Sequence, residues 1–240
     1  MAIYALGDLH GRLDIYKEIK AFLNPEDKVY FLGDAVDRGP DSWELCKAIL
    51  DDPQFEYLMG NHEDMLLAAI RSAKKYQDTG SQFDNPEFMQ CYKNEGAQTV
   101  YDCWNDPNRD YYIHLLHNLP YQKLYANECG ILVWLSHAGL TPNEYSMPGN
   151  FDLLWDREHF YDDWNEETFG PCVVVHGHTP LPYMWNYLCI PQEDRETGAF
   201  WYCNAHKICI DTGAYATNIA ILLDLDTFDE HLFEVPQIIE

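Results

Sequence analysis

The sequence lacks the features of a membrane-bound or secreted disulfide protein. No apolar run is long enough to span a membrane, and the N-terminus reaches the charged residue Asp8 without a basic region. None of the eight cysteines forms a C-x-x-C pair, and several lie within apolar runs, which favours buried thiols over disulfides. These absences predict a cytoplasmic chain.

Basic residues are also scarce. The chain has 15 lysines and arginines against 40 acidic residues, which gives a formal net charge of −25. No basic stripe is present to contact a phosphate backbone or an anionic membrane surface, so nucleic acid and membrane partners are not expected. Exposed charges are screened beyond roughly 8 Å in physiological salt, so a few cations inside a site would dominate the local field there.

The chain length and pattern predict one α/β domain over residues 1–240. Short apolar runs alternate with stretches of helical periodicity over the first third of the chain, which predicts parallel strands covered by helices. Residues from about 81 to 119 are polar and aromatic with helical stretches, and they predict an inserted helical cap. Further strand-like runs follow at residues 122–126, 131–135, 172–175, 208–210 and 219–225.

Five of the apolar runs end in or beside a small residue and are followed by side chains that bind metals. These side chains are Asp8, His10, Asp34, Asn61, His137 and His178. Ligands of open α/β sheets bind outside the carboxyl ends of the strands, and neighbouring strands lie about 4.8 Å apart, so these donors should converge. Six oxygen and nitrogen donors suit two metals about 3.5–4 Å apart, bridged by one carboxylate.

The blocks around these donors resemble those of a known family. In chain order they are GDLHG at 7–11, GDAVDRG at 33–39, GNHE at 60–63, HAG at 137–139 and GHT at 177–179. This series resembles the calcineurin-like metallophosphoesterases. The VDRG form of the second block is similar to the serine/threonine phosphoprotein phosphatases of the bacterial and bacteriophage type. The resemblance implies two mixed β-sheets in a sandwich flanked by helices, with the metal site at one edge.

The resemblance further implies a role for each matched residue. Asp8 and His10 would hold the first metal, Asp34 would bridge the two, and Asn61, His137 and His178 would hold the second. The two divalent ions would be manganese, with iron, zinc or nickel as alternatives.

The catalytic roles follow from the same resemblance. His62, oriented by Asp37, would protonate the leaving group, while Arg38 and Arg157 would bind the substrate phosphate. A metal-bridging hydroxide would attack phosphorus directly, without a phosphoenzyme.

Three further residues or motifs have competing interpretations. Glu63 is expected to support the metal ligands without binding a metal itself, and His176 is expected to fill a core position in a strand. Cys103 and Arg109 have the C-x₅-R spacing of cysteine-dependent phosphatases. The residues between them lack glycine and include a proline and an aspartate, so they cannot form a phosphate cradle of backbone N–H groups.

These observations leave three functions to compare. The first is a protein phosphatase acting on phosphoserine or phosphothreonine, which the acidic residue Asp37 beside Arg38 favours. The second is a symmetrical dinucleoside tetraphosphatase or another nucleotide hydrolase acting on a small phosphate ester. The third is a scaffold that has lost catalysis, which the complete set of ligands and His62 disfavours. The sequence leaves the oligomeric state open.

Overall fold

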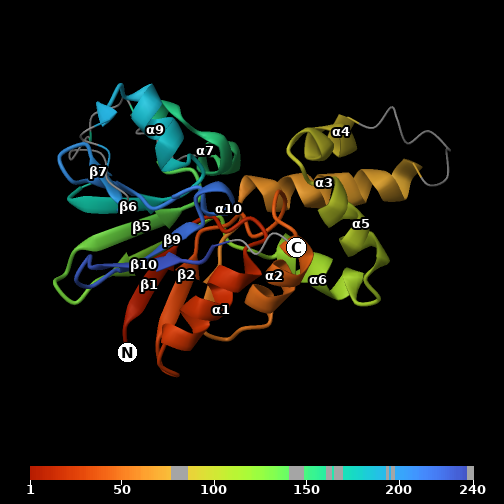
Figure 1. Ribbon diagram of the computed structural model, residues 1–240, viewed down its shortest axis with the longest axis horizontal. Helices are drawn as coiled ribbons and strands as arrows, with labels where there is room; N and C mark the ends of the chain where they lie inside the picture. The colour runs from red at the N-terminus through yellow and green to blue at the C-terminus, as the bar shows by residue number, and fades with distance from the viewer. Residues whose placement is uncertain are drawn as a thin grey trace.

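The computed structural model describes residues 1–76, 86–140, 149–160, 164, 170–192, 195 and 198–236. Within these residues the chain forms two five-stranded sheets, in the orders β10-β9-β1-β2-β3 and β4-β5-β6-β8-β7 (Figure 1). Both sheets mix parallel and antiparallel pairs, and helices lie outside them. The predicted architecture of two mixed sheets flanked by helices is therefore confirmed.

The first sheet has a parallel centre and an antiparallel edge. Its strands are β1 (Ile3–Leu6), β2 (Lys28–Phe31), β3 (Phe55–Tyr57), β9 (Ile219–Asp224) and β10 (Glu230–Glu234). Strands β1, β2 and β3 pair in parallel, and β9 joins β1 in the antiparallel sense. The parallel connections pass through α1 (Leu13–Phe22) and α2 (Ser42–Leu50), as the alternation of strand and helix signals predicts.

The second sheet also has a parallel centre, but it has an antiparallel strand at each edge. Its strands are β4 (Gln122–Ala126), β5 (Leu132–Ser136), β6 (Cys172–His176), β7 (Phe200–Tyr202) and β8 (Lys207–Cys209). Strands β5, β6 and β8 are parallel, while β4 and β7 pair in the antiparallel sense at the two edges. After β6 the chain forms α9 (Leu181–Tyr187) and, further along, β7.

Alternate residues of β1 point into two different parts of the core. Ile3 and Ala5 join an apolar cluster with Val133 and Val175 of the second sheet, so this cluster lies between the sheets. Tyr4 and Leu6 join a larger cluster with residues of α1, α2 and α3 (Asn61–Tyr76). This alternation with period two is what a strand covered on both faces requires.

Helices α4 (Pro86–Lys93), α5 (Ala97–Asn105) and α6 (Arg109–His117) fall within the region predicted as a helical cap. They lie beside α3 at the end of the molecule away from β7 (Figure 1). Residues 81–85 of the predicted cap lie outside the described residues, and the division into a domain and a cap stays a prediction. No helix among the described residues is long and apolar enough to cross a membrane.

One local expectation is wrong. The spacing of Asp41 and Glu44 predicts a capping box at the start of α2. Asp41 does occupy the N-cap position, but its side chain makes no capping hydrogen bond. Its backbone φ of −103° and ψ of 30° differ from the extended conformation that N-cap residues usually adopt, which gives a physical reason for the missing bond.

Candidate active site

The six predicted metal ligands lie together at the carboxyl ends of strands from both sheets. Each follows its strand closely, and all are buried: Asp8, His10, Asp34, Asn61, His137 and His178. The first four follow β1, β2 and β3, and the last two, His137 and His178, follow β5 and β6. The two sheets thus meet at one edge to form a metal-competent cluster of these six residues.

Tight turns place these side chains. His10, Asp34 and His178 have φ values of 43°, 60° and 68°, in the left-handed region that non-glycine residues seldom adopt. Gly60 lies against Asp34, so a Cβ there would collide with the Asp34 side chain and backbone. The glycines beside the donors therefore leave space that the converging side chains occupy, and backbone strain of this kind is concentrated at functional sites.

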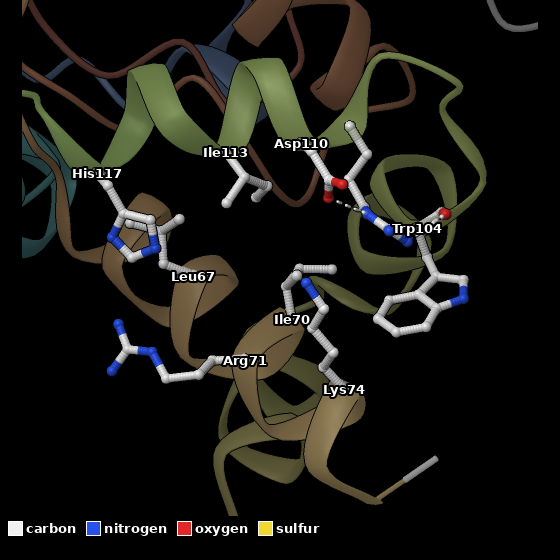
Figure 2. Close-up of a pocket in the computed structure, with 9 residues that line it drawn as sticks. Leu67, Ile70, Arg71, Lys74, Trp104, Asp110, Ile113 and His117 are labelled. Atoms are coloured by element: carbon white, nitrogen blue, oxygen red, sulfur yellow. Dashed lines mark hydrogen bonds and ion pairs between the residues drawn. The ribbon is translucent and has the colours of Figure 1, made fainter. Parts of the chain in front are cut away.

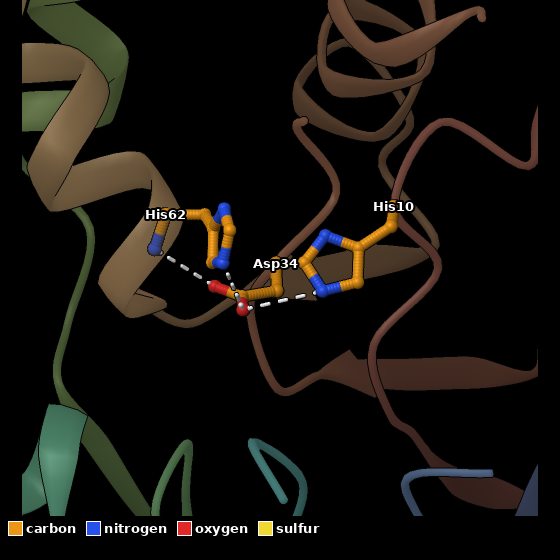
Figure 3. A group of neighbouring side chains, drawn as sticks. All are labelled: His10, Asp34 and His62. Carbon is orange, nitrogen blue, oxygen red and sulfur yellow. Dashed lines mark hydrogen bonds and ion pairs between the residues drawn. The ribbon is translucent and has the colours of Figure 1, made fainter. Parts of the chain in front are cut away.

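Asp34 lies between His10 and His62 (Figure 3). One of its oxygens lies 3.6 Å from His10 Nε2 and the other lies 3.5 Å from His137 Nε2. Its carboxylate belongs to two groups whose ligand atoms all lie within 4.8 Å of one another: His10, Asp34 and His62, and Asp8, Asp34 and His137. Asp34 therefore belongs to both groups of potential ligands, as predicted for a carboxylate shared by two cations.

The second half of the cluster centres on Asn61. Its Oδ1 lies 2.8 Å from His137 Nε2 and 3.0 Å from His178 Nδ1, and those two nitrogens are 3.2 Å apart. The opposite ring nitrogen of His178, Nε2, is buried without a hydrogen-bond partner among the described residues. Three donor atoms that converge this closely suit a single divalent cation.

Backbone carbonyls fix the histidine rings. The Nδ1 of His10 lies 2.7 Å from the carbonyl of Val36, and the Nδ1 of His137 lies 2.9 Å from that of Leu32. A ring that donates from Nδ1 keeps the lone pair of Nε2 for the cluster, as metal-binding histidines usually do. Burial lowers the pKa of His10, His137 and His178, so all three favour the neutral form that binds metals.

The carboxylates also need positive charge nearby. Burial, together with Asp211 and Asp34, raises the pKa of Asp8 well above its ordinary value. Burial would raise the pKa of Asp34 too, but His137, His62 and His10 outweigh it and hold that pKa low. Two buried carboxylates that converge with neutral histidines fit a pair of divalent cations, which would stabilise both negative charges.

His62 and Asp37 form a buried pair beside this cluster. His62 Nδ1 lies 2.7 Å from Asp37 Oδ2, and the other ring nitrogen, Nε2, lies 3.8 Å from Asp34 Oδ2. Burial opposes protonation of His62, but Asp34 and Asp37 outweigh it, so the pKa of His62 is raised. The ring therefore carries a proton readily and presents one nitrogen toward the cluster.

The two predicted phosphate-binding arginines are placed differently. The Arg38 guanidinium nitrogens lie 2.6 Å from His10 Nε2 and 3.1 Å from His62 Nε2, and the guanidinium lies 5.0 Å from the centre of the Tyr215 ring. Arg157 is exposed and donates from Nε to the Thr179 hydroxyl at 3.2 Å, directly after His178. Arg38 thus lies at the centre of the site and Arg157 lies at its rim.

Glu63 accepts hydrogen bonds from the backbone of the loops that carry the metal-competent residues, as expected of a residue that supports the ligands. Its carboxylate accepts hydrogen bonds from the N–H groups of Asp34, Ala35, Val36 and Gly60 and from the Tyr57 hydroxyl. Burial and the nearby Asp34 raise the pKa of Glu63 to about 7. Three of these five bonds come from the turn after β2 and help to hold Asp34 in its left-handed conformation.

Sequence reasoning missed two residues of the site. Asp211 is buried near Asp8, and burial raises its pKa to about 6. Tyr215, in the short helix α10 (Ala214–Thr217), places its ring 5.8 Å from that of His10. Asp211 follows an apolar run in the same way as the predicted donors, so the strand-end rule could have found it. Tyr215 has no such signal.

The remaining motifs behave as interpreted from the sequence. His176 is buried in β6 and its Nε2 bonds to the Tyr202 hydroxyl at 2.7 Å. Cys103 is buried, and burial raises the pKa of its thiol to about 12, which disfavours a reactive thiolate. Arg109 instead packs over Trp104 and lines a cavity of about 160 Å³ between α3, α5 and α6 (Figure 2). No residue of the metal-competent cluster lines this cavity.

Comparison with known proteins identifies the family. A family model described as calcineurin-like phosphoesterase matches residues 1–209, so the chain belongs to this family. The asymmetrical bis(5′-nucleosyl)-tetraphosphatase of Oceanobacillus iheyensis is 25% identical over 207 residues, 75% of this chain and 78% of that protein. Serine/threonine-protein phosphatase 2 of Escherichia coli is 27% identical over 188 residues, 73% of this chain and 78% of that protein.

Other relatives match over a shorter range. The symmetrical bis(5′-nucleosyl)-tetraphosphatase of Ectopseudomonas mendocina is 30% identical over 146 residues, 59% of this chain, and the match spans 46% of that protein. Among solved structures, a candidate diadenosine tetraphosphatase gives a TM-score of 0.62 at 17% identity and covers 96% of this chain and 92% of that one. This likeness confirms the fold. Family, fold and donor cluster together define a metal-dependent phosphoesterase.

Proposed function

We propose that the chain hydrolyses phosphate esters at a centre of two divalent cations, with His62 as the proton donor to the leaving group. The cations would be held by Asp8, His10, Asp34, Asn61, His137 and His178. When bound, they activate water and neutralise the phosphoryl oxygens. Manganese is the first candidate, and iron, zinc and nickel suit the same oxygen and nitrogen donors.

The pairing of His62 with Asp37 at 2.7 Å carries this proposal. Asp37 accepts from Nδ1–H and stabilises the imidazolium form, whose second proton, on Nε2, would be delivered to the leaving oxygen. The raised pKa of His62 favours this protonated form. An alkoxide leaving group needs such a proton, and a positioned general acid contributes roughly 10²–10⁴-fold to the rate.

The arginines bind and orient the phosphate in this proposal. Arg38 contacts two histidines of the site and packs on the Tyr215 ring. Its planar guanidinium is therefore held where it could bind a phosphate at the cluster. Arg157, bonded to Thr179, adds a second cation at the rim. Guanidinium groups bind phosphate through two parallel hydrogen bonds, which fixes orientation as well as charge.

Two substrate classes remain. Hydrolysis of phosphoserine or phosphothreonine is supported by the His62–Asp37 pair, because an alkoxide depends on a general acid more than a phosphate leaving group does. Hydrolysis of dinucleoside tetraphosphates is supported by the names of two of the relatives and by an aromatic ring close to the cluster, since Trp155 lies 6.1 Å from the His178 ring.

Turnover by metal-stripped protein reloaded with manganese tests the proposal, measured as phosphate released from a phosphopeptide and as nucleotide products formed from a dinucleotide. A phosphothreonine peptide and diadenosine tetraphosphate would be compared at equal concentration. Manganese-dependent turnover of either supports the two-cation centre, and the faster substrate identifies the class. A manganese-loaded protein that turns over no phosphate ester would refute the proposal and favour the scaffold interpretation. Inversion at a chiral phosphorothioate would further support direct hydrolysis, whereas retention would indicate a phosphoenzyme.

A further inference from the structure

Helix α7 (Asn150–Trp155) places two aromatic rings beside the metal-competent cluster. Phe151 and Trp155 are four residues apart and share one face of the helix. Their rings stack, with centroids 6.4 Å apart and planes 23° from parallel. The Trp155 ring in turn meets the His178 ring edge-on at 6.1 Å. A row of rings therefore leads outward from a metal-competent residue to Phe151.

Hydrogen bonds fix α7 to the loops that carry the cluster. The N–H of Ala138, next to His137, donates to the carbonyl of Leu153 at 2.8 Å. Just beyond the helix, Arg157 donates to Thr179, next to His178. Leu153 and Leu154 are buried and anchor the inner face of the helix. The two rings are thus held in a constant position relative to the site.

Phe151 is 73% exposed, although it lies in a helix whose two leucines are fully packed. Leaving this ring in water forgoes the stabilisation that its burial would give. A single exposed apolar side chain is ordinary. Here, however, the ring is exposed as part of a stack that ends at the active site, so its open face is available to a planar group of a bound substrate.

We propose that Phe151 and Trp155 form a nucleobase-stacking subsite, so that the substrate is a nucleotide with its phosphates at the cluster and its base on Phe151. This inference rests on the proposed hydrolysis and selects its substrate class. Any base offers a π-face to an aromatic ring, and a single sugar separates the base from its phosphates. Arg157, two residues after Trp155, places a cation on the same rim for those phosphates.

The test compares substrates with and without a base. The manganese-loaded enzyme and its Phe151→Ala variant would be assayed with diadenosine tetraphosphate and with inorganic tetraphosphate. Base stacking contributes enough affinity that the KM for the dinucleotide, relative to that for inorganic tetraphosphate, should rise about tenfold or more in the variant. Phe151→Tyr, which keeps a planar ring, should restore the wild-type ratio.

Tyr101→Ala is the matched control, because Tyr101 is 66% exposed on α5, away from α7 (Figure 1). It should leave the KM ratio unchanged. An unchanged ratio in Phe151→Ala would overturn the inference. So would an increased KM for a phosphothreonine peptide alone, which would mean that the rings bind an apolar peptide side chain.

Equilibrium dialysis of AMP against the metal-free protein separates this inference from the proposed hydrolysis. Weaker binding by Phe151→Ala than by wild type supports the subsite even if no ester is turned over. Equal binding by the two proteins contradicts it, and turnover of phosphate esters by the wild type would then leave the proposed hydrolysis standing.

Discussion

Replacing Asp37 with asparagine should weaken proton donation by His62 while almost preserving the shape of the side chain. Asp37 is buried and its Oδ2 lies 2.7 Å from His62 Nδ1. The asparagine carbonyl can still accept that hydrogen bond, but the negative charge that favours the imidazolium is lost. The pKa of His62 should therefore fall, because Asp37 is one of the two carboxylates that raise it.

The size of the effect is bounded by what a general acid contributes. Such an acid supplies roughly 10²–10⁴-fold, or about 3–5 kcal/mol of transition-state stabilisation. We expect kcat/KM for a phosphothreonine peptide to fall by about 10²-fold, the lower end of that range. The fall for p-nitrophenyl phosphate should be much smaller, because its stable phenolate leaves without a proton.

The difference between these two substrates is the decisive measurement. An equal loss on both would refute the reasoning, because Asp37 would then act on the metals or on the loop and not through leaving-group protonation. Asp41→Asn is the matched control: it removes the same charge four residues further on, where the exposed side chain makes no capping bond. That variant should keep wild-type activity on both substrates.

Four further predictions concern the site and the fold. Glu63→Ala removes the acceptor of four buried N–H groups, each costing about 1–3 kcal/mol, so urea titration should show a loss of several kcal/mol, and Glu63→Gln a smaller one. Gly60→Ala should lower manganese affinity in calorimetric titration, since its Cβ has no room beside Asp34. Chelation should abolish turnover and lower the melting temperature, and manganese should restore both. Burial opposes ionisation of Asp52, but hydrogen bonds from Lys20, Gln54 and Tyr16 together outweigh it and lower the pKa, so Asp52→Asn should cost about 1 kcal/mol at pH 7. The stability that ionised Asp52 contributes is present above about pH 4 and is lost as pH falls through the folded-state pKa. In urea unfolding, the difference in stability between wild type and Asp52→Asn should therefore be smaller at pH 3 than at pH 7.

The sequence by itself determined the identity of the metal-competent residues. Each donor follows a short apolar run and a small residue within the same few positions, and a strand followed by a tight turn is a local property. The carboxyl ends of parallel strands share one edge of a sheet, so the convergence of Asp8, Asp34 and Asn61 could be predicted from the order of elements alone. The family resemblance supplied the sandwich, which brought His137 and His178 to the same edge.

Only the tertiary structure decided which side chains meet across the site. Glu63 accepts hydrogen bonds from the backbone of a turn 27 to 29 residues earlier in the chain. Tyr215 packs against Arg38, which lies far away in the sequence. No local pattern encodes such pairs, because they depend on how elements pack after the chain has folded. The stacked rings of α7 show the same limit: their spacing predicts a shared helix face, but only packing brings Trp155 against His178.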